Sequence, residues 1–107
     1  MSQMSRYIFA VHSNAAEGRE EEYNDWYSNH HLKDLLAVPG VVSARRLTLA
    51  EQQVQPGRQP FKYFCLYEIE TDDLQDFINE LTTRAGTERM RISSSLGNSL
   101  PVFWKVM

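Results

Sequence analysis

The sequence predicts one α+β domain whose four strands and two helices follow one another in the order βαββαβ. Two observations predict the elements: short runs rich in aromatic and β-branched residues, and two longer segments with apolar residues at three-to-four spacing. A third observation predicts a single unit, residues 1–107, because a chain of this length without a linker or an internal repeat fits one domain.

The first half of the chain is expected to contain a strand, a helix and a second strand. Residues 6–12 form an apolar, aromatic run that ends at the turn signal Ser13-Asn14. Residues 17–36 form a helix, since acidic residues crowd its start and favour the positive end of the helix dipole. Its apolar stripe consists of Tyr23, Trp26, Tyr27, His30 or His31, and Leu35. Pro39-Gly40 then leads into a strand of residues 41–49.

The second half is expected to contain a strand, a helix and a final strand. Residues 50–60 are a polar hairpin connection, which is either open or an ordered lid, and residues 61–69 are the third strand. Thr71, Asp72 and Asp73 form an N-cap cluster. The helix behind it places Leu74, Phe77, Ile78 and Leu81 on one face and fades near Gly86. Residues 93–99 are expected to be a flexible loop before a last strand of residues 100–107, with Pro101 at its start.

This order predicts the split βαβ motif, a ferredoxin-like antiparallel sheet of four strands with two helices on one face. The other face is then bare. It carries either Tyr63, Cys65 and Tyr67 or Phe64 and Leu66 from the third strand, and either Val102, Trp104 and Val106 or Phe103 from the fourth. Either set is too apolar for water, so we expect a homodimer that packs through this sheet face.

Composition excludes several classes of protein. A formal net charge of −3 argues against a nucleic-acid binder. No run of residues is long and apolar enough for a membrane span, and no secretory signal opens the chain. Cys65 is the only cysteine, which favours a reducing, cytoplasmic compartment. No zinc pattern, metal-chelating histidine pair or glycine-rich phosphate loop is present, so we expect no metal and no cofactor.

Residues 24–32 and 37–41 resemble the EthD-like branch of the dimeric α+β barrel superfamily. Members often carry a Trp-Tyr pair, then His-Leu-Pro, then an apolar-Pro-Gly turn into the second strand. The matching residues are Trp26, Tyr27, His31, Leu32, Pro39 and Gly40, and Lys33 replaces the proline. The resemblance implies a homodimer of ferredoxin-like fold. It leaves the activity open among cofactor-free monooxygenases, polyketide cyclases, lactone isomerases and haem-degrading proteins, several of them active in aromatic catabolism.

His31 is the leading catalytic candidate, because an imidazole gives or takes a proton near neutral pH. The resemblance implies His31 rather than its neighbour His30, because its spacing from Trp26 and Tyr27 matches the family motif. The structural alternative is a histidine that hydrogen-bonds a backbone carbonyl at the helix end. Asp34, three residues along the helix, is expected to orient the imidazole, or else to be a solvated surface residue.

Aromatic and basic residues are the candidates for binding a ligand. Trp26 and Tyr27 either form a wall for a planar ligand or belong to the core. Tyr63, and with it Tyr7 and Tyr67, either polarises a carbonyl through its hydroxyl or simply suits a strand. One arginine of the pair Arg45-Arg46 is free to bind an anionic group, and we place Arg45 in the site. His12 either caps the end of its strand or serves as a second acid or base.

The combined prediction is a small cofactor-independent enzyme that acts on an aromatic or polyketide-like molecule by proton transfer through His31. Isomerisation, cyclisation, dehydration and oxygenation remain open. Two alternatives stand beside it: a protein that binds a hydrophobic ligand or haem without turning it over, and an accessory dimer. The fold alone does not choose among them.

Overall fold

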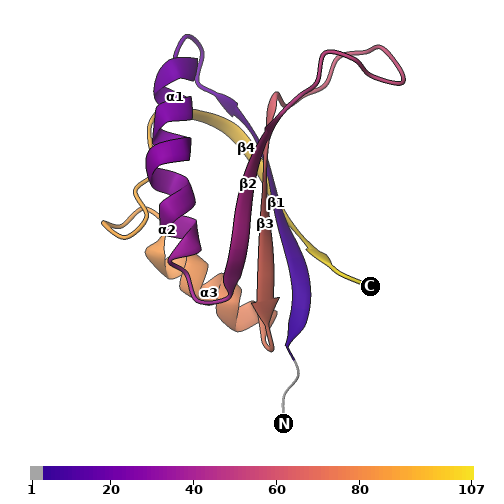
Figure 1. Cartoon of the computed structure of the whole chain (residues 1–107). Coiled ribbons are helices and arrows are strands. Elements are labelled where there is room, and N and C mark those ends of the chain that lie inside the picture. Colours follow the sequence, from indigo (N-terminus) through magenta and orange to yellow (C-terminus); the bar gives the residue numbers. More distant parts are fainter. Residues whose placement is uncertain (1–3) are drawn as a thin grey trace.

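The computed structural model describes residues 4–107 and confirms the order of elements. The elements are β1 (Ser5–Ala15), α1 (Glu20–Trp26), η1 (Tyr27–His31), α2 (Leu32–Leu36), β2 (Val41–Thr48), β3 (Tyr63–Thr71), α3 (Leu74–Arg84) and β4 (Leu96–Lys105). The segments α1, η1 and α2 follow one another as one long helix, with η1 as a π-helical turn in its middle (Figure 1).

The four strands form one antiparallel sheet in the order β2-β3-β1-β4. The central strand β1 pairs Phe9 with Tyr67 of β3 on one side and with Phe103 of β4 on the other. Both helical segments lie on the same face of the sheet (Figure 1). This is the ferredoxin-like arrangement that the sequence predicts, and it leaves the opposite face without a covering layer.

Strand β1 is longer than predicted, because Ser13-Asn14 is not a turn. Ser13 pairs with Tyr63 of β3 and with Ser99 of β4. Its buried hydroxyl bonds the Tyr23 hydroxyl at 2.5 Å, and the Asn14 side chain bonds the backbone of Pro60 and Lys62 at 2.8 Å each. Tertiary partners therefore satisfy the polar side chains that suggested a turn.

Strand β4 is also displaced from its prediction, since it begins at Leu96 rather than at residue 100. Gly97-Asn98-Ser99 belongs to the strand, and Pro101 lies inside it. Proline is tolerated there because β4 is an edge strand and pairs only with β1. Gly97 sits where the register shifts, and a Cβ at this position would lie 2.8 Å from the carbonyl oxygen of Asn14.

The other boundaries differ by a few residues. The first helix begins at Glu20 rather than at residue 17, β2 ends at Thr48, and β3 covers Tyr63–Thr71 rather than residues 61–69. Asp73 caps α3 as predicted, because its carboxylate accepts a hydrogen bond from the Asp76 backbone N–H at 3.1 Å. Gly40 has a φ of 103°, where a Cβ would press on the Phe77 ring at 3.2 Å, so the Pro-Gly turn requires glycine.

The core lies between the helices and the sheet. It is rich in aromatic rings, and Phe9 stacks on Phe103 with a centroid distance of 4.3 Å and on Tyr67 at 5.6 Å. The buried members of this core are Phe9, Tyr23, Trp26, Tyr27, Leu35, Val38, Cys65, Tyr67, Ile69, Phe77 and Met90.

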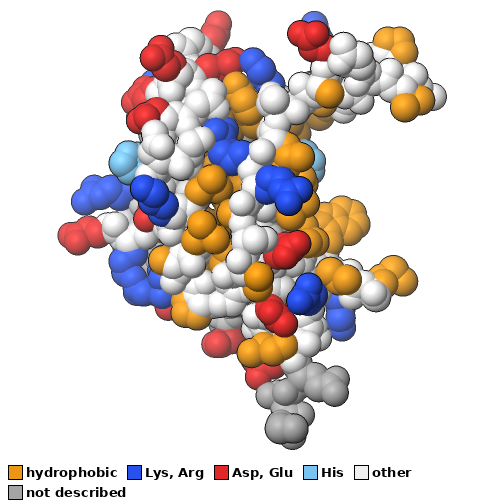
Figure 2. Space-filling model, in the orientation of Figure 1, with side chains coloured by type: hydrophobic (Ala, Val, Ile, Leu, Met, Phe, Trp, Pro, Cys, Tyr) orange, Lys and Arg blue, Asp and Glu red, His pale blue; other side chains and the backbone are white. Residues whose placement is uncertain are grey.

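The sequence left two sets of residues open for each strand on the bare sheet face. The structure places Phe64 and Leu66 there from the third strand, and Val102 and Trp104 from the fourth, followed by Val106. His12 pairs with Phe64 and Ile8 pairs with Trp104, and both alternate along β1 with the core residue Phe9. Trp104 is 63% exposed. Hydrophobic side chains gather along the right-hand side of the molecule in Figure 2, where this face lies. The loop between β2 and β3 extends away from the body at the top of Figure 1 rather than closing over the helices.

Candidate functional site

The π-helical turn η1 places His31 beside Trp26. The backbone N–H of Leu32 donates to the carbonyl oxygen of Tyr27, five residues back, so the turn holds one residue more than an α-helical turn. Residues five apart would point about 140° apart on a regular α-helix. Here the rings of Trp26 and His31 stack at 4.6 Å with an interplanar angle of 28°. The Tyr27 ring meets His31 edge-on at 4.9 Å.

These three side chains line a cavity of about 310 Å³ between the helices and the sheet. Strands β1, β3 and β4, helix α3 and the loop after α3 supply the remaining walls. The full lining is Phe9, Val11, Trp26, Tyr27, His31, Leu35, Tyr67, Leu81, Ala85, Met90, Ile92, Leu96, Ser99 and Pro101. Apart from His31, the polar groups of this lining are the indole N–H, two tyrosine hydroxyls and one serine.

The imidazole of His31 is desolvated. Its Nδ1 atom is buried without a hydrogen-bond partner in residues 4–107, and burial lowers the pKa of the ring to about 4. His31 is therefore neutral near pH 7. His30 is exposed, so the structure decides which of the two histidines faces the cavity. The Nδ1 atom therefore does not make the hydrogen bond to a backbone carbonyl that the structural alternative required.

Two tyrosine hydroxyls form a pair in the wall of the cavity. The Tyr67 hydroxyl donates to the Tyr27 hydroxyl at 3.3 Å, and both side chains are buried. Burial raises the pKa of each phenol well above its ordinary value. The pair therefore remains protonated at every physiological pH, and the Tyr27 hydroxyl is left as an O–H donor because the Tyr67 proton is shared with Tyr27. The neighbouring Cys65 thiol is buried too, and its pKa is raised for the same reason.

The structure brings only part of the predicted set together. His31, Trp26, Tyr27 and Tyr67 line one cavity, whereas Tyr7, Tyr63, Asp34 and Arg45 do not. Tyr63 is the first residue of β3, and its hydroxyl donates to Glu20 at 2.9 Å. Tyr7 lies near the opposite end of the sheet, paired with Ile69 and Lys105.

Asp34 and Arg45 lie outside the lining of the cavity. Asp34 belongs to α2, is not bonded to the His31 ring and does not line the cavity, and the Nδ1 atom of His31 has no partner among the described residues. Arg45 is exposed on the bare face, opposite Leu66. Its neighbour Arg46 points toward the helix instead, where its guanidinium bonds Ser28 and Asn24.

Sequence reasoning missed the walls that come from the end of the chain. Met90 and Ile92 of the loop after α3, and Leu96, Ser99 and Pro101 of β4, all line the cavity. The Trp26 indole N–H donates to the carbonyl oxygen of Arg91 at 3.1 Å and ties this loop to the helix. The serine and glycine content of residues 93–99 concealed Leu96 and Ser99, since it suggested a flexible loop.

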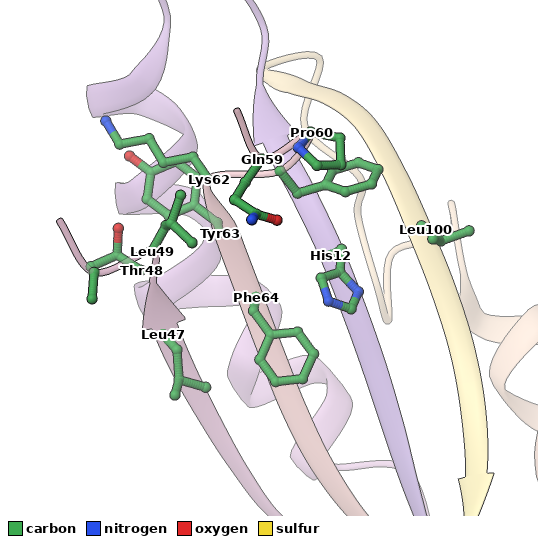
Figure 3. Close-up of a pocket in the computed structure, with 12 residues that line it drawn as sticks. His12, Leu47, Thr48, Leu49, Gln59, Pro60, Lys62, Tyr63, Phe64 and Leu100 are labelled. Carbon is green, nitrogen blue, oxygen red and sulfur yellow. The ribbon is translucent and has the colours of Figure 1, made fainter. Parts of the chain in front are cut away.

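A second hollow of about 470 Å³ lies on the bare sheet face, beneath the base of the β2–β3 loop. Figure 3 shows His12, Phe64 and Gln59 around it. The His12 ring packs on Phe64 at 4.6 Å, and its Nδ1 is buried without a partner in residues 4–107. Strand alternation puts His12 on the face opposite His31, so the two histidines do not form one site.

Residues 4–107 contain no group of three or more histidine, cysteine or carboxylate side chains that could hold a metal ion. No helix in the same range is long and apolar enough to cross a membrane.

The fold and the cavity define a small α+β protein with a ferredoxin-like sheet and an apolar pocket that His31 lines. The chain belongs to the family described as a domain of unknown function, DUF4286, whose model matches residues 6–93. No curated protein is significantly similar to it in sequence.

Solved structures confirm the fold that the resemblance implied. An ethyl tert-butyl ether D (EthD) family protein from Bacillus halodurans superimposes with a TM-score of 0.62 and 18% identity, over 96% of this chain and 99% of that chain. A variant of MhuD with two manganese protoporphyrin IX molecules bound per active site gives a TM-score of 0.61 and 16% identity, over 94% and 93%. At such identities the likeness concerns the fold alone.

Proposed function

We propose that this protein is a cofactor-independent enzyme that holds an uncharged, planar aromatic or polyketide-like molecule in the His31 cavity and moves a proton on it. The observation that carries the proposal is the neutral imidazole of His31, which lines an apolar cavity between Trp26 and Tyr27. A desolvated imidazole without a structural hydrogen bond at Nδ1 is costly to keep, and proton transfer to a ligand gives it a role.

The size and polarity of the cavity restrict the ligand. A volume of about 310 Å³ is near the lower end of the range for small-molecule sites and suits one or two fused rings. The lining contains no lysine, arginine, aspartate or glutamate. A charged ligand would lose its hydration there without gaining a partner, so neutral ketones, phenols and lactones are favoured over carboxylates.

The groups in the wall suit the formation of an enolate. The imidazole takes a proton from a carbon next to a carbonyl, or from a phenol, and becomes imidazolium. The electron pair moves onto the ligand oxygen, where the Tyr27 hydroxyl is able to donate a hydrogen bond while it accepts one from the Tyr67 hydroxyl. Return of the proton to a different carbon completes an isomerisation. Cyclisation and dehydration begin with the same step.

A thermal-shift screen tests the proposal, because a ligand that binds only the folded state raises the unfolding midpoint. Wild type, His31→Ala and the matched control His30→Ala are screened against phenols, quinones, lactones and polyketide fragments. We expect one chemical class to stabilise wild type and His30→Ala but not His31→Ala, and turnover of that class to vanish in His31→Ala. Unchanged turnover in His31→Ala would refute the mechanism.

Haem binding is the second candidate, because a neutral imidazole is an iron ligand and the MhuD structure contains porphyrin. The cavity fits haem poorly: its volume is small for a tetrapyrrole, and none of its lining residues is a cation that would neutralise the propionates. A visible absorption band after haem addition that disappears in His31→Ala would favour haem all the same. A screen without any stabilising compound would favour an accessory dimer.

We propose further that two copies pair through the bare sheet face. Trp104, Leu100 and Leu47 are each more than two-fifths exposed on it, and burying such a patch is favourable. Sedimentation tests this: wild type should be a dimer, and Trp104→Lys should be a folded monomer or a weaker dimer. A monomeric wild type contradicts it. Cys65 is a buried free thiol, which suits the cytoplasmic location we propose.

A further inference from the structure

Arg46 occupies an unusual position on the helix-facing side of β2. Its guanidinium carbon lies 4.7 Å from the centroid of the Tyr27 ring, 5.4 Å from that of Tyr23 and 5.6 Å from that of Tyr63. None of the ion pairs found in residues 4–107 includes Arg46. A half-buried cation without a carboxylate is retained here by aromatic faces and neutral oxygen acceptors.

The hydrogen bonds of Arg46 go to the helix opposite. Nη1 donates to the Ser28 hydroxyl at 2.8 Å, and Nη2 donates to the Asn24 side-chain oxygen at 2.9 Å. Ser28 belongs to the π-helical turn η1, and so does Tyr27, whose ring is the nearest of the three to the guanidinium. From β2, Arg46 therefore contacts two consecutive residues of the turn, the Tyr27 ring and the Ser28 hydroxyl.

The π-helical turn needs such support from outside. A π turn is less stable than the α-helical turn that it replaces and persists where tertiary contacts hold it. The stacking of Trp26 on His31 exists only in this turn, because regular α geometry would point residues five apart in different directions. Tyr27 lies between the two features: its ring contacts the guanidinium on one side and the edge of His31 on the other.

We propose that Arg46 is a positioning residue for His31: through Ser28 and Tyr27 it holds the π-helical turn in place and thereby keeps the imidazole in the cavity. Arg46 itself does not line the cavity and touches no ligand there. Its importance for turnover rests on the proposed function, whereas its effect on the His31 ring does not.

The position of the His31 ring can be followed by NMR titration of its ring protons without any ligand. Burial alone accounts for the low pKa of His31, so this pKa reports how far water reaches the ring. We compare wild type with Arg46→Met, which removes the guanidinium, and Arg46→Lys, which keeps the charge but loses the planar fork. Ser28→Ala removes one bond to the turn at an exposed position, and Arg45→Met on the bare face is the matched control.

We expect the His31 pKa to rise from about 4 by at least about one pH unit in Arg46→Met and Arg46→Lys, as the ring gains water. Ser28→Ala should move it in the same direction by less, and Arg45→Met should leave it unchanged. A folded Arg46→Met with an unchanged His31 titration overturns the proposal, and so does Arg45→Met with an equal rise. If Arg46→Met does not fold, an unchanged titration in Ser28→Ala overturns it.

A plain structural role for Arg46 would lower the unfolding midpoint without moving the His31 titration. Failure of the proposed function has a different signature: no compound in the thermal-shift screen stabilises wild type, while the titration results stand. The two proposals can therefore fail separately.

Discussion

Replacing His31 with phenylalanine should make the protein markedly less sensitive to acid. The ring of the variant still stacks on Trp26, but it does not titrate. In wild type, burial holds the His31 pKa at about 4 in the folded state, against an ordinary value of 6.5. Between these values the unfolded chain binds more protons than the folded one, so the free energy of unfolding falls as the pH falls through this window.

The size of the effect follows from the two pKa values. A difference of roughly 2.5 pH units at 1.36 kcal/mol each is a loss of about 3 kcal/mol between pH 7 and pH 4. That is a large part of the stability of a small domain, which is typically about 5–15 kcal/mol. The stabilising contribution is complete above pH 6.5, where His31 is neutral in both states.

Urea unfolding followed by tryptophan fluorescence at several pH values between 4 and 8 measures this. We expect wild type to lose about 3 kcal/mol more than His31→Phe over that range. His30→Ala should keep the wild-type slope, because His30 is exposed. Parallel pH profiles for wild type and His31→Phe, within about 0.5 kcal/mol, would show that the ring is not desolvated and would refute the reasoning.

Two further predictions concern the cavity wall and the displaced strand. Tyr67→Phe removes the hydroxyl that donates to Tyr27, so it should lower kcat on the ligand class found in the screen by roughly 10-fold or more while KM changes little; an unchanged kcat would exclude the hydroxyl pair from the chemistry. Gly97→Ala forces a Cβ against the backbone oxygens of Asn14 and Ala15 at 2.8 and 2.9 Å and should cost about 1–3 kcal/mol of unfolding free energy. The control Gly57→Ala, with no atom within 4 Å of its Cβ, should cost almost nothing, and equal losses in both would contradict the close approach.

The fold was predictable because local patterns and topology agree. The apolar stripe of the first helix, the Asp73 cap and the Pro39-Gly40 turn each specify one local structure, and the order βαββαβ admits few arrangements. The errors fall where a tertiary partner overrides local preference. Ser13 and Asn14 favour a turn in isolation, but Tyr23 and the backbone beside β3 bind their side chains and keep the strand extended.

The site was only partly predictable, because the key feature is a change of helical register. Trp26, Tyr27 and His31 were found from their residue types and spacing, and the choice between His30 and His31 came from a resemblance. No local sequence pattern predicts a π turn, since contacts with residues distant in sequence, such as Arg46, stabilise its extra residue. Asp34 was chosen on α-helical spacing, but its side chain does not line the cavity. Arg45 was chosen between two adjacent arginines, and strand alternation places it on the opposite face of the sheet.

The two faces of β2 show how the surroundings of a side chain change between adjacent residues of a strand. Arg45 and Arg46 are chemically identical neighbours, yet strand alternation exposes Arg45 opposite Leu66 and turns Arg46 toward three tyrosine rings. In the proposed role, Arg46 lies outside the cavity but keeps the His31 ring inside it. It does so because it stabilises the π-helical turn in which Trp26 and His31 stack. An uncharged cavity and a half-buried Arg46 can then occur in the same structure, because Arg46 does not line the cavity. The guanidinium bonds the Ser28 hydroxyl on the helix, while the lining of the cavity contains no lysine, arginine, aspartate or glutamate and suits an uncharged ligand.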